Sequence, residues 1–416
     1  MLELDFSLAF DAATDAEFFA ALPSKPAVCL VELNDSNAEP LLIRTQDLRR
    51  RLQRLLGPPD PTSKRLNLRA LARGVRYRPV GSTFEQSLTY YQHAKKLFPQ
   101  RYRDLLRMRP PAVLKVSLRN AYPRCYVTRH ISVDSSGTPT AGSYYGPFPS
   151  RGAALAFANR ALDFFKMRRC QIKIRRDPTF PGCLYSEMKM CLAPCFAGCS
   201  KEEYDAEVER FVKFLESSGE SLRATFESER ERASADLDFE RAATLHKKVE
   251  KLDEVLRGRP DLARRIQALD AVILQRGAGD QVVAAYRVEG GRLCEPFFLP
   301  FGEIASQPRS AEQIFRNYLD PADDSVGATQ LPNGSRNASP NGAEQPGTLR
   351  VIEHQLPLAK GELSEHLWLV ARWFYSNPRT GEIFFHAKND WPYRRILRAC
   401  SRLLAPPEPP KEPSAN

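Results

Sequence analysis

Five cysteines lie close together in this chain of 416 residues: Cys170, and then four in the stretch CLYSEMKMCLAPCFAGC at 183–199. The whole chain has only nine cysteines, far below the density of a disulfide scaffold. The N-terminus MLELDFSLAFDAATDAEFF lacks the basic segment of a signal peptide, and no apolar run is long enough to predict a membrane span. We therefore expect a cytoplasmic protein with reduced thiols, in which clustered cysteines act as metal ligands.

Basic residues outnumber acidic ones and lie in clusters. The formal net charge is +11, and lysine and arginine recur over 44–54, 69–79, 95–109 and 166–176, interleaved with tyrosines. Such a surface is suited to a phosphate backbone, through counterion release and base stacking. The alternative is solvated helix faces whose arginine stems cover apolar surface. The candidate nucleic-acid contacts are Arg44, Arg49, Arg50, Arg51, Lys95 and Lys96.

The spacing of apolar residues predicts a multidomain α+β fold. Short apolar runs predict strands near 27–33, 40–45, 111–118, 124–133, 270–275, 281–289 and 292–300. Helical spacing appears over 46–57, 83–98, 151–165 and 364–376, and SYYGPFPS at 143–150 reads as a rigid loop. The segment 323–348, rich in Gly, Pro, Ser and Asn, predicts a disordered linker.

A helical segment follows the cysteines. Ser200 and Glu203 have the spacing of a capping box, and two further helices are predicted over 220–237 and 238–256. Asp238 is placed to cap the second of these. Charges of both signs alternate along the pair, which indicates exposed, paired helices.

Four stretches in register resemble the UvrC family, the incision subunit of bacterial nucleotide excision repair. They are KVSLRNAYPRCYVTRH, YYGPFPS, the C-x7-C-x3-C of 183–195 and ADLDFERAATLHKKVEKL, within about residues 20–300. The last of them resembles the family's UVR helical hairpin. The resemblance implies a truncated UvrC-like protein with a degenerate GIY-YIG nuclease domain.

The resemblance also bears on the cysteines. It implies an iron–sulfur cluster, of the [4Fe-4S] type, on Cys170, Cys183, Cys191 and Cys195, with Cys199 as a spare thiol or alternative ligand. The gaps between these cysteines are poor for the short paired knuckles of a zinc site, although zinc and no metal both stay open.

The nuclease motifs of the family fall on residues that cannot perform its chemistry. By the resemblance, the two motif tyrosines fall at Cys29 and Leu41, and the metal-binding glutamate falls at Tyr90, while Arg51 is retained. Leucine supplies no phenol, and tyrosine is a poor ligand for a hard cation near neutral pH. We therefore predict no catalytic residue and no Mg²⁺ site; Glu85, one helical turn away, is the alternative ligand.

The hairpin implies a partner. By its resemblance to the UVR motif, it docks a UvrB-type protein through Leu237, Phe239, Glu240, Ala243 and Leu245. The alternative is that this apolar stripe packs on residues 200–220 of the same chain.

The expected organisation follows in order along the chain. It comprises a degenerate GIY-YIG-like domain (1–110), a strand, loop and helix segment (111–165), a cysteine-rich metal loop (166–200), helices including the hairpin at about 222–257 (201–260), an RNase H-like remnant (261–400) and a disordered tail (401–416). We expect a non-catalytic scaffold in excision repair that contacts DNA and UvrB. The alternatives are an endonuclease with a rebuilt centre and an interaction module without a DNA role.

Overall fold

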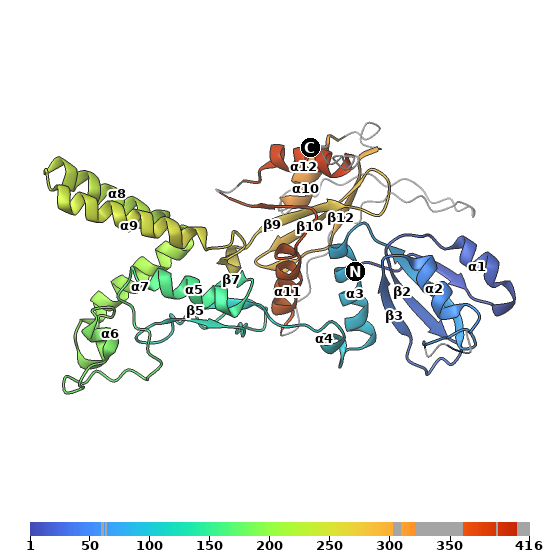
Figure 1. Ribbon diagram of the computed structural model, residues 1–416, viewed down its shortest axis with the longest axis horizontal. Coiled ribbons are helices and arrows are strands. Elements are labelled where there is room, and N and C mark those ends of the chain that lie inside the picture. The colour runs from blue at the N-terminus through green and yellow to red at the C-terminus, as the bar shows by residue number, and fades with distance from the viewer. Residues whose placement is uncertain (60–61, 63–64, 303–308, 321–360, 388–389, 406–416) are drawn as a thin grey trace, which may run out of the picture.

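The computed structural model describes residues 1–59, 62, 65–302, 309–320, 361–387 and 390–405 (Figure 1). The described residues form a mixed α+β, multidomain fold with three antiparallel sheets, in agreement with the predicted class. The predicted linker at 323–348 and residues 406–416 of the predicted tail lie outside the described part. None of the described helices combines the length and the apolar character needed to cross a membrane.

The N-terminal sheet has helices on both faces. Its strands are ordered β1 (Phe6–Ala9), β4 (Ala72–Pro79), β2 (Ala27–Leu33) and β3 (Leu41–Thr45). One face carries η1 (Ala12–Thr14), α1 (Asp15–Ala21) and α2 (Leu48–Leu56), and the other carries α3 (Thr83–Leu97), which α4 (Tyr102–Leu105) follows. Because side chains alternate along a strand, Val31 and Ile43 pack toward α2 whereas Leu30 and Leu42 pack toward α3.

A second sheet forms the middle of the chain. Its order is β6 (Cys125–Thr128), β5 (Ala112–Val116), β7 (Ser143–Phe148) and β8 (Arg264–Arg265). Helix α5 (Arg151–Leu162) follows β7 in the sequence and covers this sheet. The next elements along the chain are α6 (Leu184–Glu187), η2 (Pro194–Phe196) and α7 (Lys201–Glu216). The capping box predicted for Ser200 and Glu203 is present at the start of α7.

The predicted loop at 143–150 is wrong in its first part, which is the buried central strand β7. Pro147 can lie inside this strand because the register with β5 shifts between Ala112 and Leu114, where a proline without an N–H disturbs the ladder least. The aromatic side chains Tyr144, Tyr145 and Phe148 are buried on its two faces, which explains why the segment is extended and central.

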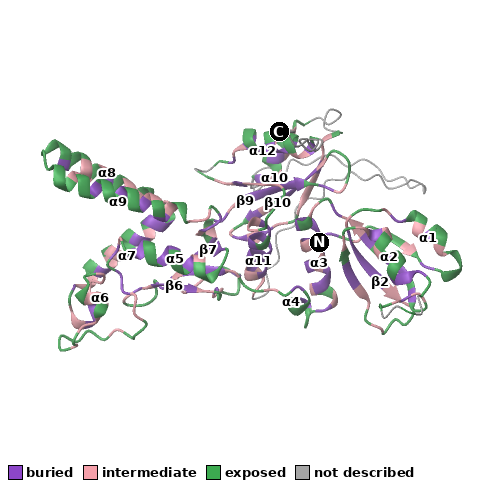
Figure 2. Cartoon of the chain, viewed as in Figure 1, coloured by how far each residue is buried: buried purple, intermediate pink, exposed green. Residues whose placement is uncertain are grey.

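The hairpin of α8 (Glu220–Ala235) and α9 (Phe239–Arg257) projects from one end of the molecule (Figure 1). The side chain of Asp238 accepts a hydrogen bond from the backbone N–H of Arg241, as predicted for a cap. Figure 2 shows that the outer part of this hairpin is largely exposed, whereas its base is buried against the middle of the chain.

The C-terminal sheet is an antiparallel meander joined by a later strand. Its strands are ordered β11 (Arg292–Leu293), β10 (Val282–Glu289), β9 (Ala271–Arg276) and β13 (Glu382–Phe385), and β12 (Phe297–Pro300) also pairs with β10. The short helix η3 (Ile266–Ala268) precedes β9 in the sequence. One face packs on α11 (Glu362–Phe374) and the other on α10 (Ala311–Leu319) and α12 (Tyr393–Leu404). Residues 401–404 are therefore the last turn of α12 rather than part of a disordered tail, because Leu404 is buried in this core.

One apolar core joins the two ends of the sequence. It contains Leu30 and Leu42 of the first sheet, Tyr91 of α3, Tyr286 of β10 and Trp368 of α11. The backbones also meet closely here, since a Cβ on Gly81 would lie 2.1 Å from the carbonyl carbon of Gly277. The N-terminal sheet, α3, α11 and the C-terminal sheet thus share one packed interior.

Candidate functional site

The positions that the UvrC resemblance assigns to nuclease chemistry lie on two faces of the N-terminal sheet. Cys29 is fully buried between the sheet and α2, and burial raises the pKa of its thiol to about 12. Leu41 packs against the same core, and Arg51 lies on α2. Tyr90 lies on α3, across the sheet from Cys29. These four residues do not converge on one site.

Tyr90 is paired with an arginine instead of a metal-binding group. The guanidinium carbon of Arg44 lies 5.4 Å from the centroid of the Tyr90 ring, a cation–π distance. Burial raises the pKa of the Tyr90 phenol, and the nearby Arg44 charge offsets only part of this effect. The phenol is therefore neutral near pH 7, which makes it a poor ligand for a hard cation.

Glu85, the alternative metal ligand, is held inside the protein. One of its carboxylate oxygens accepts a hydrogen bond from the Gly81 N–H at 2.9 Å, and the other is 3.4 Å from Nε of Arg78. Burial raises the pKa of this carboxyl, although the Gly81 N–H and Arg78 oppose the shift. Arg78 is in turn paired with Asp5 at 2.6 Å.

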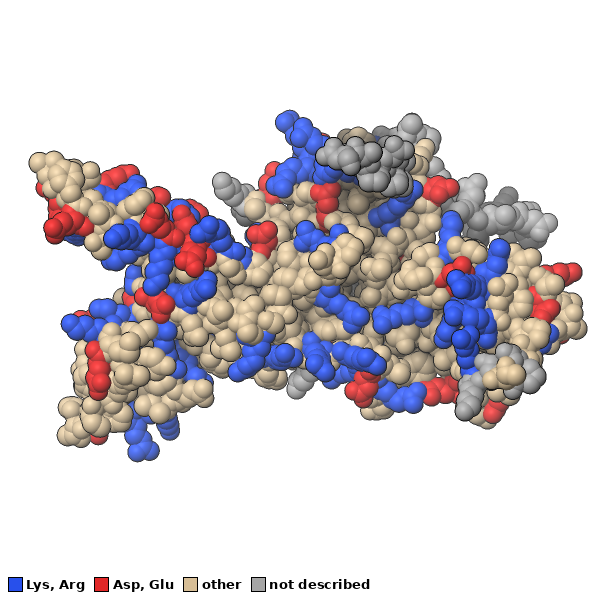
Figure 3. All heavy atoms as spheres, in the orientation of Figure 1, with Lys and Arg blue, Asp and Glu red and all other residues tan. Residues whose placement is uncertain are grey.

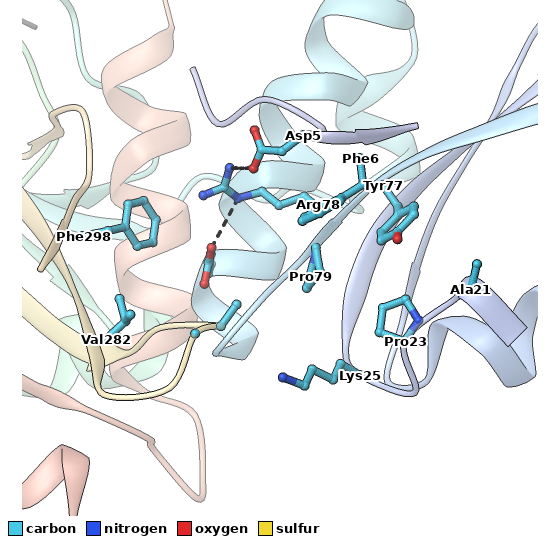
Figure 4. A pocket seen from close by; sticks show the side chains of 13 residues that line it. Asp5, Phe6, Ala21, Pro23, Lys25, Tyr77, Arg78, Pro79, Val282 and Phe298 are labelled. Carbon is cyan, nitrogen blue, oxygen red and sulfur yellow. Dashed lines mark hydrogen bonds and ion pairs between the residues drawn. The ribbon is translucent and has the colours of Figure 1, made fainter. Parts of the chain in front are cut away.

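These groups line a cavity of about 500 Å³ between β1, β4 and the C-terminal sheet (Figure 4). Figure 4 shows Arg78 beside Asp5, with Phe298 facing it from β12 and Lys25 at the other side. The rings of Phe6 and Tyr77 are stacked with centroids 5.3 Å apart. Because Arg78 pairs with both carboxylates, Asp5 and Glu85 do not form the free acidic cluster that a divalent cation needs.

The six predicted nucleic-acid contacts divide into two groups. Arg49 donates to the carbonyls of Leu22 and Ala20 at 2.7 and 3.2 Å, and Lys95 pairs with Glu362 at 2.8 Å, so both serve the fold. The exposed group consists of Arg44, Arg50 and Lys96, with Arg51 half-buried. In Figure 3, Lys and Arg side chains form a row that crosses this face from α11 over α3 to the N-terminal sheet.

The four predicted ligand cysteines lie on the loop between α5 and α7. Burial raises the pKa of the Cys191 thiol to about 11, and the charges of Cys170, Cys195 and Cys183 act in the same direction. The Ala193 N–H donates to the sulfur of Cys191 at 3.3 Å. Within the described ranges, however, no three His, Cys, Asp or Glu side chains are close enough to hold a metal ion.

Cys199 has a different environment from the other four. It is buried in the apolar core of the middle sheet with Tyr204 and Phe211. The loop itself is tightly wound, with left-handed backbone at Lys189, Ala193 and Ala197. The first four cysteines supply soft thiols, and a backbone N–H is directed at the sulfur of one of them, which is the donor chemistry that an iron–sulfur cluster uses, whereas Cys199 is a core residue.

The predicted docking residues of the hairpin also divide. Leu237 and Phe239, at the tip, are 71% and 67% exposed, the highest values among the large apolar side chains of the described residues. Glu240 and Ala243 are exposed as well. Leu245 is only 3% exposed and packs with Val249 and Leu252 into the core of the middle sheet. That half of the stripe therefore packs inside the same chain, where α9 contacts α8 and α5 rather than mainly the predicted residues 200–220.

Sequence reasoning missed a polar group at the junction of α3 and α11. The buried carboxylate of Glu365 accepts hydrogen bonds from Tyr91 at 2.6 Å, Tyr102 at 2.5 Å and Arg103 at 2.7 Å. It also missed Arg372, which extends over the ring of Trp368 on the same helix. The available signal was the presence of Glu365 and Arg372 in an otherwise apolar helical segment, ELSEHLWLVARWF.

Comparison with known proteins gives a consistent result. The family model for the middle domain of the UvrC/Cho excinuclease matches residues 112–214, from the first residue of β5 into α7. UvrABC system protein C of Carboxydothermus hydrogenoformans is 30% identical over 256 residues, 61% of this chain and 40% of that protein. The Chlamydia abortus protein of the same name is 26% identical over 292 residues, 69% of this chain and 47% of that protein.

The chain therefore spans less than half of the length of these curated relatives. The Idiomarina loihiensis UvrABC system protein C is 32% identical over a shorter segment, 38% of this chain and 26% of that protein. No solved structure matches the chain. The matched segment contains β5, β6 and β7 of the middle sheet, the cysteine loop and most of α7, and these matches support the assignment of the chain to the UvrC family.

Proposed function

We propose that this chain is a non-catalytic scaffold of nucleotide excision repair, which contacts DNA through its basic face and docks a UvrB-type protein through the α8–α9 hairpin. The observation that carries the proposal is the tip of that hairpin. Leu237 and Phe239 expose more of their surface than any other large apolar side chain in the described residues. Exposed aromatic and aliphatic anchors on a projecting element are typical of interface hot spots.

The non-catalytic role is supported by the N-terminal sheet. Cys29 is buried on one face and Tyr90 lies on the other, so the family positions assigned to a motif tyrosine and to the metal ligand do not meet there. Glu85, which could act as a substitute ligand, is engaged by Arg78 and Gly81. An endonuclease with a rebuilt centre is the alternative, and it predicts Mg²⁺-dependent incision.

The cysteine loop would hold an iron–sulfur cluster through Cys170, Cys183, Cys191 and Cys195. A cluster bound there supplies four metal–thiolate bonds that cross-link a segment with little regular structure. Zinc on the same thiols is the alternative. The support for this proposal is that all four thiols belong to one loop, which has left-handed backbone at Lys189, Ala193 and Ala197 and a backbone N–H that donates to the sulfur of Cys191.

The docking proposal is tested by measuring the affinity of the purified chain for UvrB. Phe239→Ala should weaken binding roughly thirtyfold, because loss of a hot-spot side chain costs about 2 kcal/mol. Leu71→Ala is the matched control, since Leu71 is also an exposed apolar residue, at 55%, but lies in the N-terminal region. Equal affinity for UvrB in both variants would show that the hairpin tip is not the docking site.

The scaffold proposal is tested by reconstitution with UvrA, UvrB, ATP, Mg²⁺ and damaged duplex DNA. The chain should produce no incision in this mixture. Incision that is lost in Arg51→Ala or Glu85→Gln would support the endonuclease instead. The UvrB measurement is independent of this result, so docking and catalysis are judged separately.

A further inference from the structure

Helices α3 and α11 pack antiparallel across the junction between the N-terminal sheet and the C-terminal sheet. At one end, Lys95 of α3 pairs with Glu362 of α11 at 2.8 Å. At the other end, the ring of Phe84 lies 5.7 Å from the ring of Trp373. Arg372 is the neighbour of Trp373, so it lies beside the first turns of α3 rather than beside its end.

Arg44 reaches the same part of α3 from the opposite side. Gln86 of α3 donates to the carbonyl of Thr45 at 2.8 Å, which fixes the end of β3 against the first turn of the helix. Arg44 precedes Thr45, and its guanidinium carbon lies 5.4 Å from the ring centroid of Tyr90, one turn farther along. Arg44 and Arg372 therefore flank the exposed side of α3.

Both arginines rest on aromatic rings of one core. The guanidinium carbon of Arg372 lies 5.2 Å from the ring centroid of Trp368, which belongs to the shared apolar core, and Tyr90 packs against that core. Burial lowers the pKa of Arg372, and the positive charge of Arg44 lowers it further. The placement of the two arginines around α3 rests on their contacts with Tyr90 and Trp368, and the electrostatic effect of Arg44 on Arg372 agrees with it.

Two positive side chains that are held close to each other repel, and an anion bound between them offsets this repulsion. Guanidinium groups match the oxygen geometry of a phosphate and bind it through paired N–H donors. We propose that Arg44 and Arg372 together form a clamp for one phosphate of a DNA backbone. The inference rests on the proposed DNA contact and assigns it a specific site, which includes a residue of the C-terminal region.

The clamp needs no divalent cation. Tyr90 occupies the position that the family resemblance assigns to a metal-binding glutamate, and Arg44 lies over it. A phosphate there meets positive charge supplied by the protein itself. Binding of DNA at this site should therefore be the same in EDTA as in Mg²⁺, apart from the general effect of ionic strength.

The test is a fluorescence anisotropy titration of the full chain with labelled duplex DNA in EDTA. Arg44→Gln and Arg372→Gln keep a side chain over the ring and remove the charge. Each should weaken binding roughly tenfold, as expected for loss of one charged hydrogen-bonded contact. The double variant should be about as weak as either single variant, because both arginines hold the same phosphate.

Arg316→Gln is the matched control. Arg316 also lies over an aromatic ring, 4.1 Å from the centroid of Tyr393, but it belongs to α10 on the opposite face of the C-terminal sheet. It should bind DNA as the unaltered chain does. Thermal melting of each variant checks that the fold is kept.

The possible outcomes separate the clamp from the wider proposal. If the unaltered chain shows no salt-dependent DNA binding, the proposed DNA contact itself is wrong. If it binds DNA but Arg372→Gln behaves like Arg316→Gln, the contact stands and the clamp is wrong. If the two single effects add in the double variant, the arginines act on separate phosphates, which also contradicts the clamp.

Discussion

The phenol of Tyr91 donates a hydrogen bond of 2.6 Å to the carboxylate of Glu365, although 274 positions of sequence separate the two residues. Tyr102 and Arg103 donate to the same carboxylate, and Lys95 lies 3.5 Å from it. These hydrogen bonds lower the pKa of Glu365 even though burial acts in the opposite direction. The carboxylate is therefore charged at neutral pH and joins α3 and α4 to α11.

Replacement of Glu365 by glutamine should destabilise this junction. The amide cannot match the charge of Arg103 and Lys95, and hydrogen bonds to charged groups contribute about 1.5–3 kcal/mol. We expect a loss of roughly 2 kcal/mol in the free energy of unfolding, measured by urea denaturation at pH 7. Glu362→Gln is the control, because Glu362 pairs with Lys95 but receives no tyrosine hydrogen bond among the described contacts. Equal losses in the two variants would contradict a special role for Glu365.

His366 should make the stability depend on pH. Its Nδ1 accepts a hydrogen bond from the Leu293 N–H at 3.2 Å, which requires a neutral ring, and burial lowers its pKa to about 4. Between pH 6.5 and 4 the unfolded chain binds a proton on this residue that the folded chain does not. Stability is therefore highest above pH 6.5 and falls toward pH 4, by roughly 3 kcal/mol for this residue.

The measurement is the difference in unfolding free energy between the unaltered chain and His366→Gln at several pH values. The variant should lose this part of the pH dependence. His246→Gln, which alters an exposed histidine of α9, should keep it. A constant difference between the unaltered chain and His366→Gln from pH 7 to 4.5 would show that His366 does not titrate as described.

The cysteine loop gives a prediction on metal content. An anaerobic preparation should be brown and contain iron and acid-labile sulfide, because one loop supplies four thiols at positions 170, 183, 191 and 195. Cys183→Ser should lose the metal and melt earlier, since the bonds to the cluster also stabilise the fold. Cys199→Ala should keep the iron, because Cys199 lies in the apolar core. A colourless protein with one zinc ion would contradict the iron–sulfur assignment.

The hairpin gives a prediction on stability that separates its two halves. Leu245→Ala should lower the free energy of unfolding by about 2–5 kcal/mol, because it opens a cavity in a packed core. Phe239→Ala should change it by less than about 0.5 kcal/mol, because the ring is largely exposed. Chemical denaturation of both variants provides the comparison. Early unfolding of Phe239→Ala would mean that the tip packs inside the protein.

Local patterns in the sequence predicted much of the secondary structure. The strands β2, β3, β5, β9 and β10 and the helices α2, α3, α5 and α7 form where apolar spacing and capping residues indicated them. Asp238 and Ser200 cap helices as expected, because a cap depends on residues only three positions apart. The central strand β7 was missed, since its pairing partners β5 and β8 are distant in sequence.

The motifs also pointed to the UvrC family before any fold was known, because each motif is a short run of residues. Their order along the chain is a property of the sequence. Other properties depend on which surface another element covers, so the sequence alone does not determine them. They are the burial of Leu245, the exposure of Leu237 and the ion pair of Lys95 inside the chain.

The sequence by itself determined the chemistry that is available: the side chains of Cys29 and Leu41 where the family resemblance would place tyrosines, the excess of positive charge and the thiols between Cys170 and Cys195. Only the tertiary structure decided which of these groups meet. It places Cys29 and Tyr90 on opposite faces of one sheet, and it brings Arg44 of β3 over the Tyr90 ring of α3, and Arg372 over Trp368 of α11, the helix packed on α3. The physical reason is that burial of apolar surface packs α11 against α3 whatever their distance along the chain. The charged side chains at the rim of this contact are positioned by the same packing.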